Sequence, residues 1–329
     1  MMTIFTRIFA IATVLFLAPI QADAQKKLIS QLDSMLTARY NHADIDTNYV
    51  IRPQTKWTLT GQLKASGTRI RINEREDGNH TETEFDADMK STLSLNVSYI
   101  GLSLSLSINP AKLLGKYRDT ELTFRSYGKR FGFDLTFHDA SNFKGYLDSD
   151  GIRREFISIE GRMNVQTLNM NAYYAFNHRR FSYPAAFSHN YIQRRSTGSI
   201  LLAASMQAQQ GKMNGDGNNI DFSMGSVGIG AGYGYNFVPG HGWLIHISCL
   251  PTLVVSGSST FTSNDTSETM KRKFPEYILT TRSAVVKQLG KNMFAGLSSV
   301  YTLTRIGCAD RTVFRNYKWI THLYFGYRL

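Results

Sequence analysis

The stretch Gly101-Leu102-Ser103-Leu104-Ser105-Leu106-Ser107-Ile108 decides the fold of this chain. Its even-numbered residues are aliphatic and the residues between them are serine. An extended strand would therefore place Leu and Ile on one face and hydroxyl groups on the other. A water-soluble sheet usually carries Lys, Glu or Thr on its polar face. Bare leucine facing lipid and small hydroxyls facing a crowded lumen are typical of the wall of a transmembrane β-barrel.

The same alternation recurs on both sides of this stretch. The apolar residues Leu93, Leu95, Val97 and Tyr99 alternate with Ser94, Asn96 and Ser98. The short Ile100-Gly101 joint predicts a hairpin with the next strand. The final strand stops at Leu329, and an amphipathic terminal strand with an apolar last residue is typical of bacterial barrels. We therefore predict an all-β fold, an antiparallel transmembrane β-barrel of about 12 strands (10 to 14) with a short N-terminal helix. Further segments of the same period lie at 131–138, 227–237, 243–249, 297–303 and 319–329.

Two changes of phase leave the strand count open. The pattern from Trp57 to Leu63 switches before Ile70 and Ile72, so Ala65-Ser66-Gly67 is either a tight turn or a bulge within one long strand. A second switch lies between residues 165 and 168. Joints alternate between short and long, as in outer-membrane barrels. The longer joints are expected at 77–88, 138–151, 211–219 and 257–275. The stretch 177–198 is also long, but the alternation of short and long joints does not assign it to either end of the barrel.

Aromatic residues make up 12% of the chain. Several fall close to the expected strand ends, where aromatic belts lie at the lipid boundary. Their positions predict a girdle formed by Tyr99, Tyr127, Tyr174, Tyr235, Trp243, Tyr301 and Trp319.

The N-terminus predicts export. Arg7 precedes an apolar run over 8–20, and Ala22-Asp23-Ala24 is a small-x-small cleavage pattern, so residues 1–24 are expected to be a signal peptide. Residues 25–55 form a leader in which 26–39 has the spacing of a short amphipathic helix, in the lumen or in the periplasm. The barrel is expected over 56–329. The exported protein is expected to lie in the cell outer membrane.

Composition narrows the partners. The chain carries a net charge of +12, and export disfavours nucleic acid, so the expected partners are outer-membrane lipid, lipopolysaccharide and the barrel assembly machinery. Cys249 and Cys308 lie far apart and do not form a disulfide framework. Closely spaced Cys or His pairs of a metal site are missing from the sequence. We predict no cofactor and no metal.

Polar residues offer few candidates for chemistry. His246 and Ser248 share a strand face, and His138 precedes Asp139 and Ser141, but a triad needs a third group from elsewhere in the chain. We therefore assign no catalytic, cofactor-binding or metal-binding residue. Basic pairs in or beside loops could contact lipid phosphates or be solvated, and these are Arg153-Arg154, Arg179-Arg180, Arg194-Arg195 and Lys271-Arg272-Lys273.

Alternate glycines run from Gly228 to Gly234 on one strand face. The missing side chains allow a sharp bend of the wall, or the close approach of a plug, loop or ligand.

Motifs from residue 99 to 146 resemble a known family. They include Asn109-Pro110, Asp119-Thr120-Glu121 and Phe143-Lys144-Gly145-Tyr146, and the later Phe181 to Phe187 is similar to a second motif block. The family is the Bacteroidetes domain of unknown function 4421. The resemblance implies a signal-bearing, barrel-like envelope protein with no assigned activity, and it supplies no catalytic residue.

The sequence leaves the function with three hypotheses. The leading one is an outer-membrane barrel with a structural or passive-transport role, in which lumen polarity and loop charge set any selectivity. The second is a lipid-modifying barrel enzyme, an esterase or acyltransferase, in which Ser, His and an acid would converge at one rim. The third, a soluble periplasmic β-protein, predicts that the aliphatic strand faces pack inward.

Overall fold

A computed structural model describes residues 30–31, 33–35, 37–38, 44–76, 79–87, 89–100, 102–108, 120–140, 143–156, 163–214, 219–263, 266–269, 272, 275–308 and 312–329. The expected signal peptide lies outside these residues. The chain divides into two compact units, residues 1–44 and Ile45–Leu329. In the first unit the described residues between 30 and 38 are helical, within the span where a short amphipathic helix is expected.

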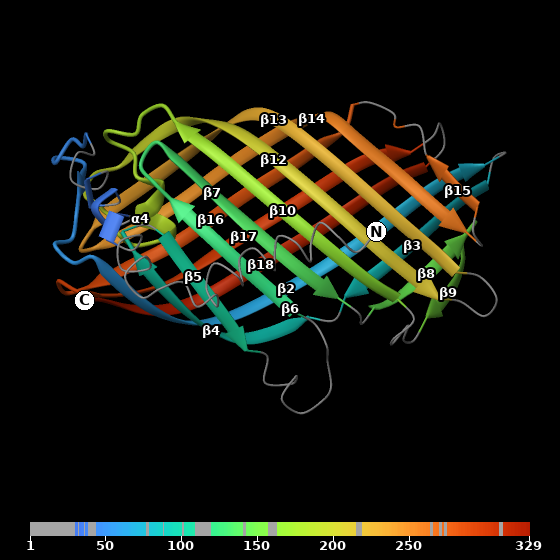
Figure 1. The fold of residues 1–329 in the computed structure, drawn as a ribbon, viewed down its shortest axis with the longest axis horizontal. Coiled ribbons are helices and arrows are strands. Elements are labelled where there is room, and N and C mark those ends of the chain that lie inside the picture. The colour runs from blue at the N-terminus through green and yellow to red at the C-terminus, as the bar shows by residue number, and fades with distance from the viewer. Residues whose placement is uncertain are drawn as a thin grey trace. The chain divides into compact units, whose positions relative to one another are not determined.

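The second unit is an antiparallel sheet whose pairings return to the strand from which they start (Figure 1). The closing contact joins the last strand to the first, from Arg328 opposite Thr58 to Thr312 opposite Glu74, and Leu329 N–H donates to the Trp57 carbonyl at 2.9 Å. The all-β antiparallel barrel predicted from the alternation is therefore confirmed. The ring of described strands runs β2 (Trp57–Glu76), β4 (Lys90–Tyr99), β5 (Leu102–Ile108), β6 (Thr120–Tyr127), β7 (Phe131–Ala140), β10 (Met163–Ala175), β12 (Thr197–Asn214), β13 (Asn219–Gly240), β14 (Trp243–Ser263), β16 (Tyr277–Leu289), β17 (Met293–Cys308) and β18 (Thr312–Arg328).

The two ends of the barrel differ. One end, the base, carries the short turns at Ile100, His241 and Gly290 and the end of β18. Inside the base lies the connection 176–196, which contains α4 (Tyr183–Phe187) and β11 (Ile192–Gln193). β11 pairs with β1 (Val50–Ile51), so residues that the sequence assigns to the leader lie against this connection.

The other end, the mouth, carries strands where the sequence predicts loops. β3 (Asn79–Ala87) pairs with β2 and with β8 (Phe143–Ser149), and β8 pairs with β9 (Ile152–Phe156). β15 (Thr266–Thr269) pairs with β14. The long connections 77–88, 138–151 and 257–275 are thus partly sheet, which extends the wall beyond the strands of the ring (Figure 1).

Polarity along the middle of the wall is the reverse of that in a soluble protein. In the hairpin β4–β5, Leu93 and Leu95 are 56% and 50% exposed, whereas Ser94 and Asn96 are 3% and 6% exposed. The hairpin has the predicted register, with Tyr99 opposite Leu102. Because apolar side chains face outward and polar ones inward, the wall matches a surface solvated by lipid.

Neither a turn nor a bulge causes the phase switch in β2. The strand pairs with β18 from Thr58 to Glu74 without a shift of register. Leu63 points outward and is exposed, whereas Ile70 is 1% exposed and points inward. The alternation of side chains is therefore unbroken, and the polarity of the two faces is exchanged. β10 behaves in the same way, with Val165 buried inside and Leu168 outside in one continuous strand.

Near the mouth an apolar cluster occupies the interior. It joins β2 and β17, which lie close together in the ring, to β10 and β13, which lie in a distant part of it, so the cluster crosses the lumen. Its buried members are Ile70, Phe85, Ala87, Ala140, Phe143, Met163, Val165, Met224, Ile306 and Phe314.

The predicted aromatic girdle includes Tyr99, Tyr235 and Trp243, which point outward, but it is wrong at Tyr127. Trp57 and Tyr99 lie 4.5 Å apart between ring centroids on the outer face near the base, and Tyr235 and Trp243 are exposed there. Tyr127 is only 4% exposed, because it points into the lumen and packs against Tyr173.

Candidate functional site: a bridged and plugged lumen

Residues 176–196, the plug segment, fill the lumen at the base. The segment is held by aromatic packing, because Tyr183 lies 4.3 Å from Tyr173 and 5.1 Å from Phe187 and His246 between ring centroids. Ser182 begins α4 by accepting a hydrogen bond from the Ala185 N–H at 3.2 Å. These buried contacts order a connection that has no strand periodicity.

Gly234 explains how the plug segment fits against the wall. A Cβ atom at this position would lie 3.0 Å from Cζ of Phe181. Within the glycine run, this residue therefore provides room for the plug, one of the two roles expected from the sequence.

Polar wall residues hold the backbone of the plug segment. Asn236 Nδ2 donates to the Ser182 carbonyl at 2.9 Å and to Gln193 Oε1 at 3.0 Å. Gln193 Nε2 in turn donates to the carbonyls of Arg180 at 2.7 Å and Arg195 at 3.0 Å. These bonds satisfy backbone groups that have left the sheet.

An ion pair bridges the lumen above the plug segment. Arg282 on β16 and Asp134 on β7 are joined through Nη2 and Oδ2, although five pairings of the ring separate their strands. Nη1 of Arg282 also donates to the Tyr183 hydroxyl at 2.9 Å. Arg282 therefore ties two distant parts of the wall and the plug segment together.

A cavity of about 40 Å³ adjoins this bridge. Its lining comes from β6, β7, β10, β16, β17 and β18. The charged members are Arg125, Arg282, Lys318 and Asp134, and polar neutral members include Asn169, Asn171, Thr136 and Thr302.

Around the bridge, inward basic side chains outnumber carboxylates. Strand residues that point inward include Lys64, Lys90, Arg125, Arg282, Lys318 and Arg328, and the inward carboxylates include Asp134 and, nearer the mouth, Glu276 and Glu74. A low-dielectric interior strengthens the field of such charges.

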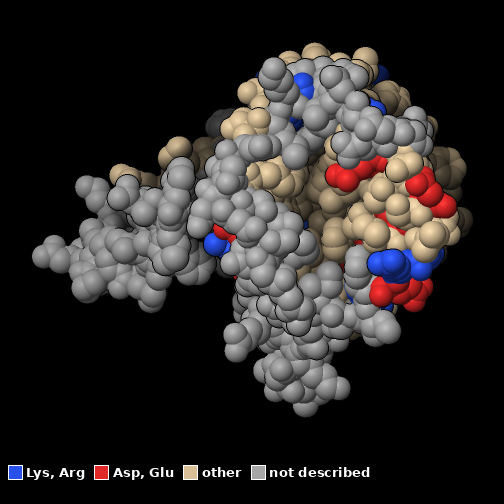
Figure 2. All heavy atoms as spheres, turned by 90° about the vertical axis from the view of Figure 1, so that its right-hand side faces the viewer, with Lys and Arg blue, Asp and Glu red and all other residues tan. Residues whose placement is uncertain are grey.

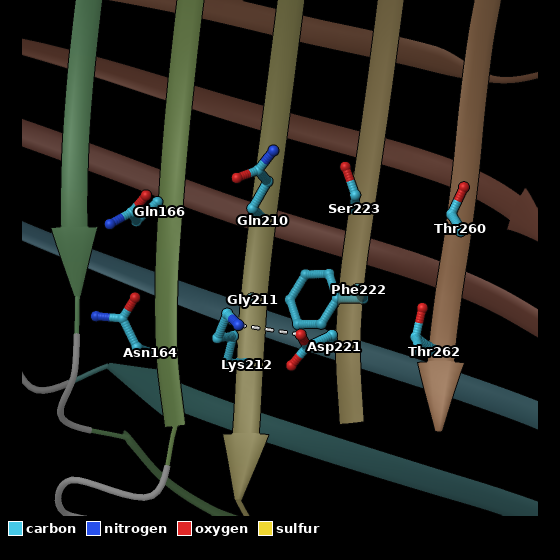
Figure 3. Close-up of a pocket in the computed structure, with 10 residues that line it drawn as sticks. All are labelled: Asn164, Gln166, Gln210, Gly211, Lys212, Asp221, Phe222, Ser223, Thr260 and Thr262. Carbon is cyan, nitrogen blue, oxygen red and sulfur yellow. Dashed lines mark ion pairs between the residues drawn. The ribbon is translucent and has the colours of Figure 1, made fainter. Parts of the chain in front are cut away.

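On the outer face, a polar zone follows the apolar belt toward the mouth. Leu135, Met170 and Met206 are register neighbours in the belt, and four residues nearer the mouth the row is Asp139, Gln166 and Gln210. A shallow pocket of about 330 Å³ lies here, formed by β10, β12, β13 and β14, with an ion pair of 3.1 Å between Lys212 and Asp221 (Figure 3).

Charged side chains of β2 and β3 lie at the mouth, where Figure 2 shows acidic and basic side chains close together. Arg71 donates to Glu84 at 2.9 Å and Arg69 to Asp86 at 2.7 Å. Glu82 accepts from Asn73 and from Tyr146, both at 2.9 Å. Burial alone would raise the pKa of Glu82, but these hydrogen bonds lower it below its ordinary value.

The candidate catalytic residues do not converge in the described part of the chain. His246 and Ser248 both point inward, but His246 bonds to Asn236 at 2.7 Å and Ser248 to the Tyr183 hydroxyl at 3.3 Å. His138 points inward beside Lys90 at 2.8 Å, whereas Asp139 points outward. Ser141 lies outside the described residues.

The basic pairs lie at opposite ends of the barrel. Arg153 stacks over the Tyr146 ring at the mouth, and Arg180 pairs with Asp46 at 3.2 Å at the base. Arg272 is buried against Glu276 at 2.7 Å and is not a solvated loop residue. Lys271 and Lys273 lie outside the described residues.

Arg282 and Asp134 were missed in the sequence as site residues. The sequence does contain a signal for them. Each is a charged residue at an inward position of an alternating strand, where the neighbouring inward residues are Thr, Ala or Gly. The sequence could not predict that Arg282 and Asp134 pair with each other, since this contact depends on the order and curvature of the ring.

Two further features are absent from the part of the chain that the structure describes. Helices long and apolar enough to cross a membrane do not occur in this part of the chain. Groups of three or more His, Cys, Asp or Glu side chains able to hold a metal ion do not occur among the same residues.

An antiparallel β-barrel with an apolar belt outside, a polar lumen and an inserted plug segment belongs to the transmembrane class of barrels. The model of the family described as Domain of unknown function (DUF4421) matches residues 44–329, so the chain belongs to this family. A search of curated proteins finds no match.

Solved structures similar to this chain include outer-membrane barrels. The outer membrane protease OmpT from Escherichia coli has a TM-score of 0.41 at 6% identity, covering 84% of this chain and 97% of that one. The translocator domain of the autotransporter NalP from Neisseria meningitidis has a TM-score of 0.26 at 9% identity, covering 95% and 100%.

Proposed function

We propose that this protein is an outer-membrane β-barrel that offers small polar solutes a passive route, closed in the described conformation by the plug segment. The observation that carries the proposal is the exposure of the aliphatic strand faces, as at Leu93, Leu95 and Leu323. In water such a belt would be an aggregation surface, whereas lipid solvates it.

The two ends suggest an orientation. Outer-membrane barrels have short periplasmic turns and longer connections outside the cell. The base, with its turns at Ile100 and Gly290, then faces the periplasm and receives the assembly machinery at the closing strand. The polar zone around Gln166 and Gln210 lies where the belt ends toward the mouth, so its partners are lipid and lipopolysaccharide headgroups.

A passive route is supported by the lumen itself. Between the plug segment and the apolar cluster at the mouth, hydroxyl, amide and basic side chains line the interior. Such a lining suits hydrated solutes. Passage requires the plug segment and the Arg282–Asp134 bridge to move, so the route is a gated one.

The other two hypotheses have less support. An esterase or acyltransferase needs a nucleophile next to a base, whereas Ser248 and His246 bond to Tyr183 and Asn236. A soluble periplasmic β-protein needs inward aliphatic faces, which is the opposite of the arrangement in β4, where Leu93 and Leu95 face outward.

Two measurements test the proposal. Envelope fractionation and heat-modifiable gel migration would show an outer-membrane barrel, and recovery in the soluble periplasmic fraction would rule it out. Planar bilayers then test the route by comparing the wild type with a Phe181→Ala, Tyr183→Ala double variant. We expect low conductance for the wild type and higher conductance for the variant, with Phe131→Ala on the outer face as the control. Zero conductance in both would favour a structural wall.

A further inference from the structure

We propose that the cavity beside the Arg282–Asp134 bridge is a binding site for a doubly charged tetrahedral oxyanion, of which inorganic phosphate and sulfate are the simplest examples. The site would make solutes that carry such groups the class favoured by the gated route, and this last step rests on the proposed function.

Charge is the first argument. The lining supplies the cations Arg125, Arg282 and Lys318 and the single carboxylate Asp134, which gives three positive charges minus one negative charge, a net +2. Asp134 is already engaged, because Arg282 pairs with it and Asn171 Nδ2 donates to it at 3.2 Å. A cleft lined mainly by charges of one sign focuses their field and attracts the opposite charge. A dianion is the complement of this lining.

Geometry is the second argument. Arg282 is 2% exposed, and its Nε atom has no hydrogen-bond partner within the described part of the chain. A buried guanidinium donor without a partner is unusual, since buried polar groups are normally satisfied. An oxyanion in the adjoining cavity would accept from this donor.

Size and donor set are the third argument. A water molecule needs roughly 10–15 Å³ of comparable volume, so the cavity of about 40 Å³ holds a group of a few heavy atoms and not a whole sugar or peptide. Arg125 and Lys318 approach from different parts of the wall, on β6 and β18, which are four pairings apart in the ring. Thr136, Thr302 and Asn169 add neutral groups that can donate to oxyanion oxygens. Guanidinium and ammonium groups bind such oxygens strongly through charge-assisted hydrogen bonds.

The experiment is isothermal titration of the folded full-length protein in detergent, with sodium sulfate and sodium phosphate at constant ionic strength. We expect one site per chain. Arg125→Gln and Lys318→Met should each weaken binding roughly tenfold or more, as expected for loss of a charged hydrogen-bond donor. Lys212→Met removes the same charge from the outer face and should bind as the wild type does.

A second arm needs no variant. Perchlorate has the same shape as sulfate but a single charge, so it should bind the wild-type protein at least several-fold more weakly. Lack of sulfate and phosphate binding by the folded wild type, equal binding of perchlorate, or wild-type affinity in folded Arg125→Gln and Lys318→Met would overturn the proposal. Binding in detergent requires neither export nor conductance, so failure here leaves the barrel proposal intact, and failure of the barrel proposal leaves the titration interpretable.

Discussion

Arg328 on the closing strand β18 donates a hydrogen bond from Nε to the backbone carbonyl of His189 in the plug segment, at 2.8 Å. Its Nη1 atom donates to Gln288 Oε1 at 2.9 Å, and its guanidinium lies 4.7 Å from the centroid of the Phe294 ring. The strand that completes the barrel is therefore also a support of the plug segment.

Arg328→Met should loosen the base of the plug segment. The substitution keeps much of the side-chain volume but removes two charge-assisted hydrogen bonds, each worth about 1.5–3 kcal/mol. We expect a lower midpoint of heat-modifiable unfolding and more frequent channel openings in planar bilayers. Arg154→Met, at an exposed position near the mouth, is the matched control. An unchanged midpoint would mean that the bond to His189 contributes little.

The lumen bridge should show strong coupling in a double-mutant cycle. Asp134→Asn leaves Arg282 buried without its counter-charge, and breaking a buried pair in this way costs about 3–5 kcal/mol. The double variant Asp134→Asn, Arg282→Met should recover part of this loss, because the uncompensated charge is gone. Urea unfolding of the detergent-folded protein measures each free energy. Additive effects of the two single changes would contradict a direct interaction.

A charge placed in the outer belt should impair folding into a bilayer. Leu95→Arg places a charge in the lipid-facing belt, which costs about 2–4 kcal/mol at the middle of a bilayer. We expect impaired folding into phospholipid vesicles, measured by the fraction of heat-modifiable protein. Leu95→Ile should fold normally. Equal folding of the two variants would argue against a lipid-facing position.

The strands at the mouth should weaken in acid through Glu82. Its pKa is lowered in the folded protein, so its stabilising contribution is complete above the ordinary carboxyl pKa and is lost as the pH falls through the lower folded value. The difference in urea midpoint between the wild type and Glu82→Gln should be constant from pH 7 to about pH 5 and should shrink below about pH 4.5. The exposed Glu155→Gln serves as the control for general charge effects. A difference that persists in strong acid would exclude this carboxylate as the cause.

The barrel wall was predictable because lipid selects one face of each strand. Leu93, Leu95 and their neighbours carry that selection in a period of two, and register follows from it. Beyond the lipid, apolar residues are no longer selected on one face of a strand. The sequences of β3 and β8 therefore look like loops, although the two strands pair with each other.

The lumen was much harder to predict. Residues 176–196 have no period, because aromatic contacts and side-chain hydrogen bonds order them instead of a sheet. Arg282 and Asp134 are distant in sequence, and only the order of strands in the ring brings them together. Tyr127 is a further example. Successive side chains of a strand face lipid and lumen in turn, so an error of one residue in the alternation changes the side to which an aromatic residue is assigned.

The uninterrupted strand β2 has a consequence for how the protein settles in a bilayer. Its outward positions change from Leu59 and Leu63 to Arg69 and Arg71 without any break in the backbone. The immersion depth of the barrel is thereby encoded in a single strand, between Leu63 and Arg69. An insertion of two residues in this interval would preserve which side chains face outward and yet raise the charged rim, so the protein would be matched to a thicker membrane.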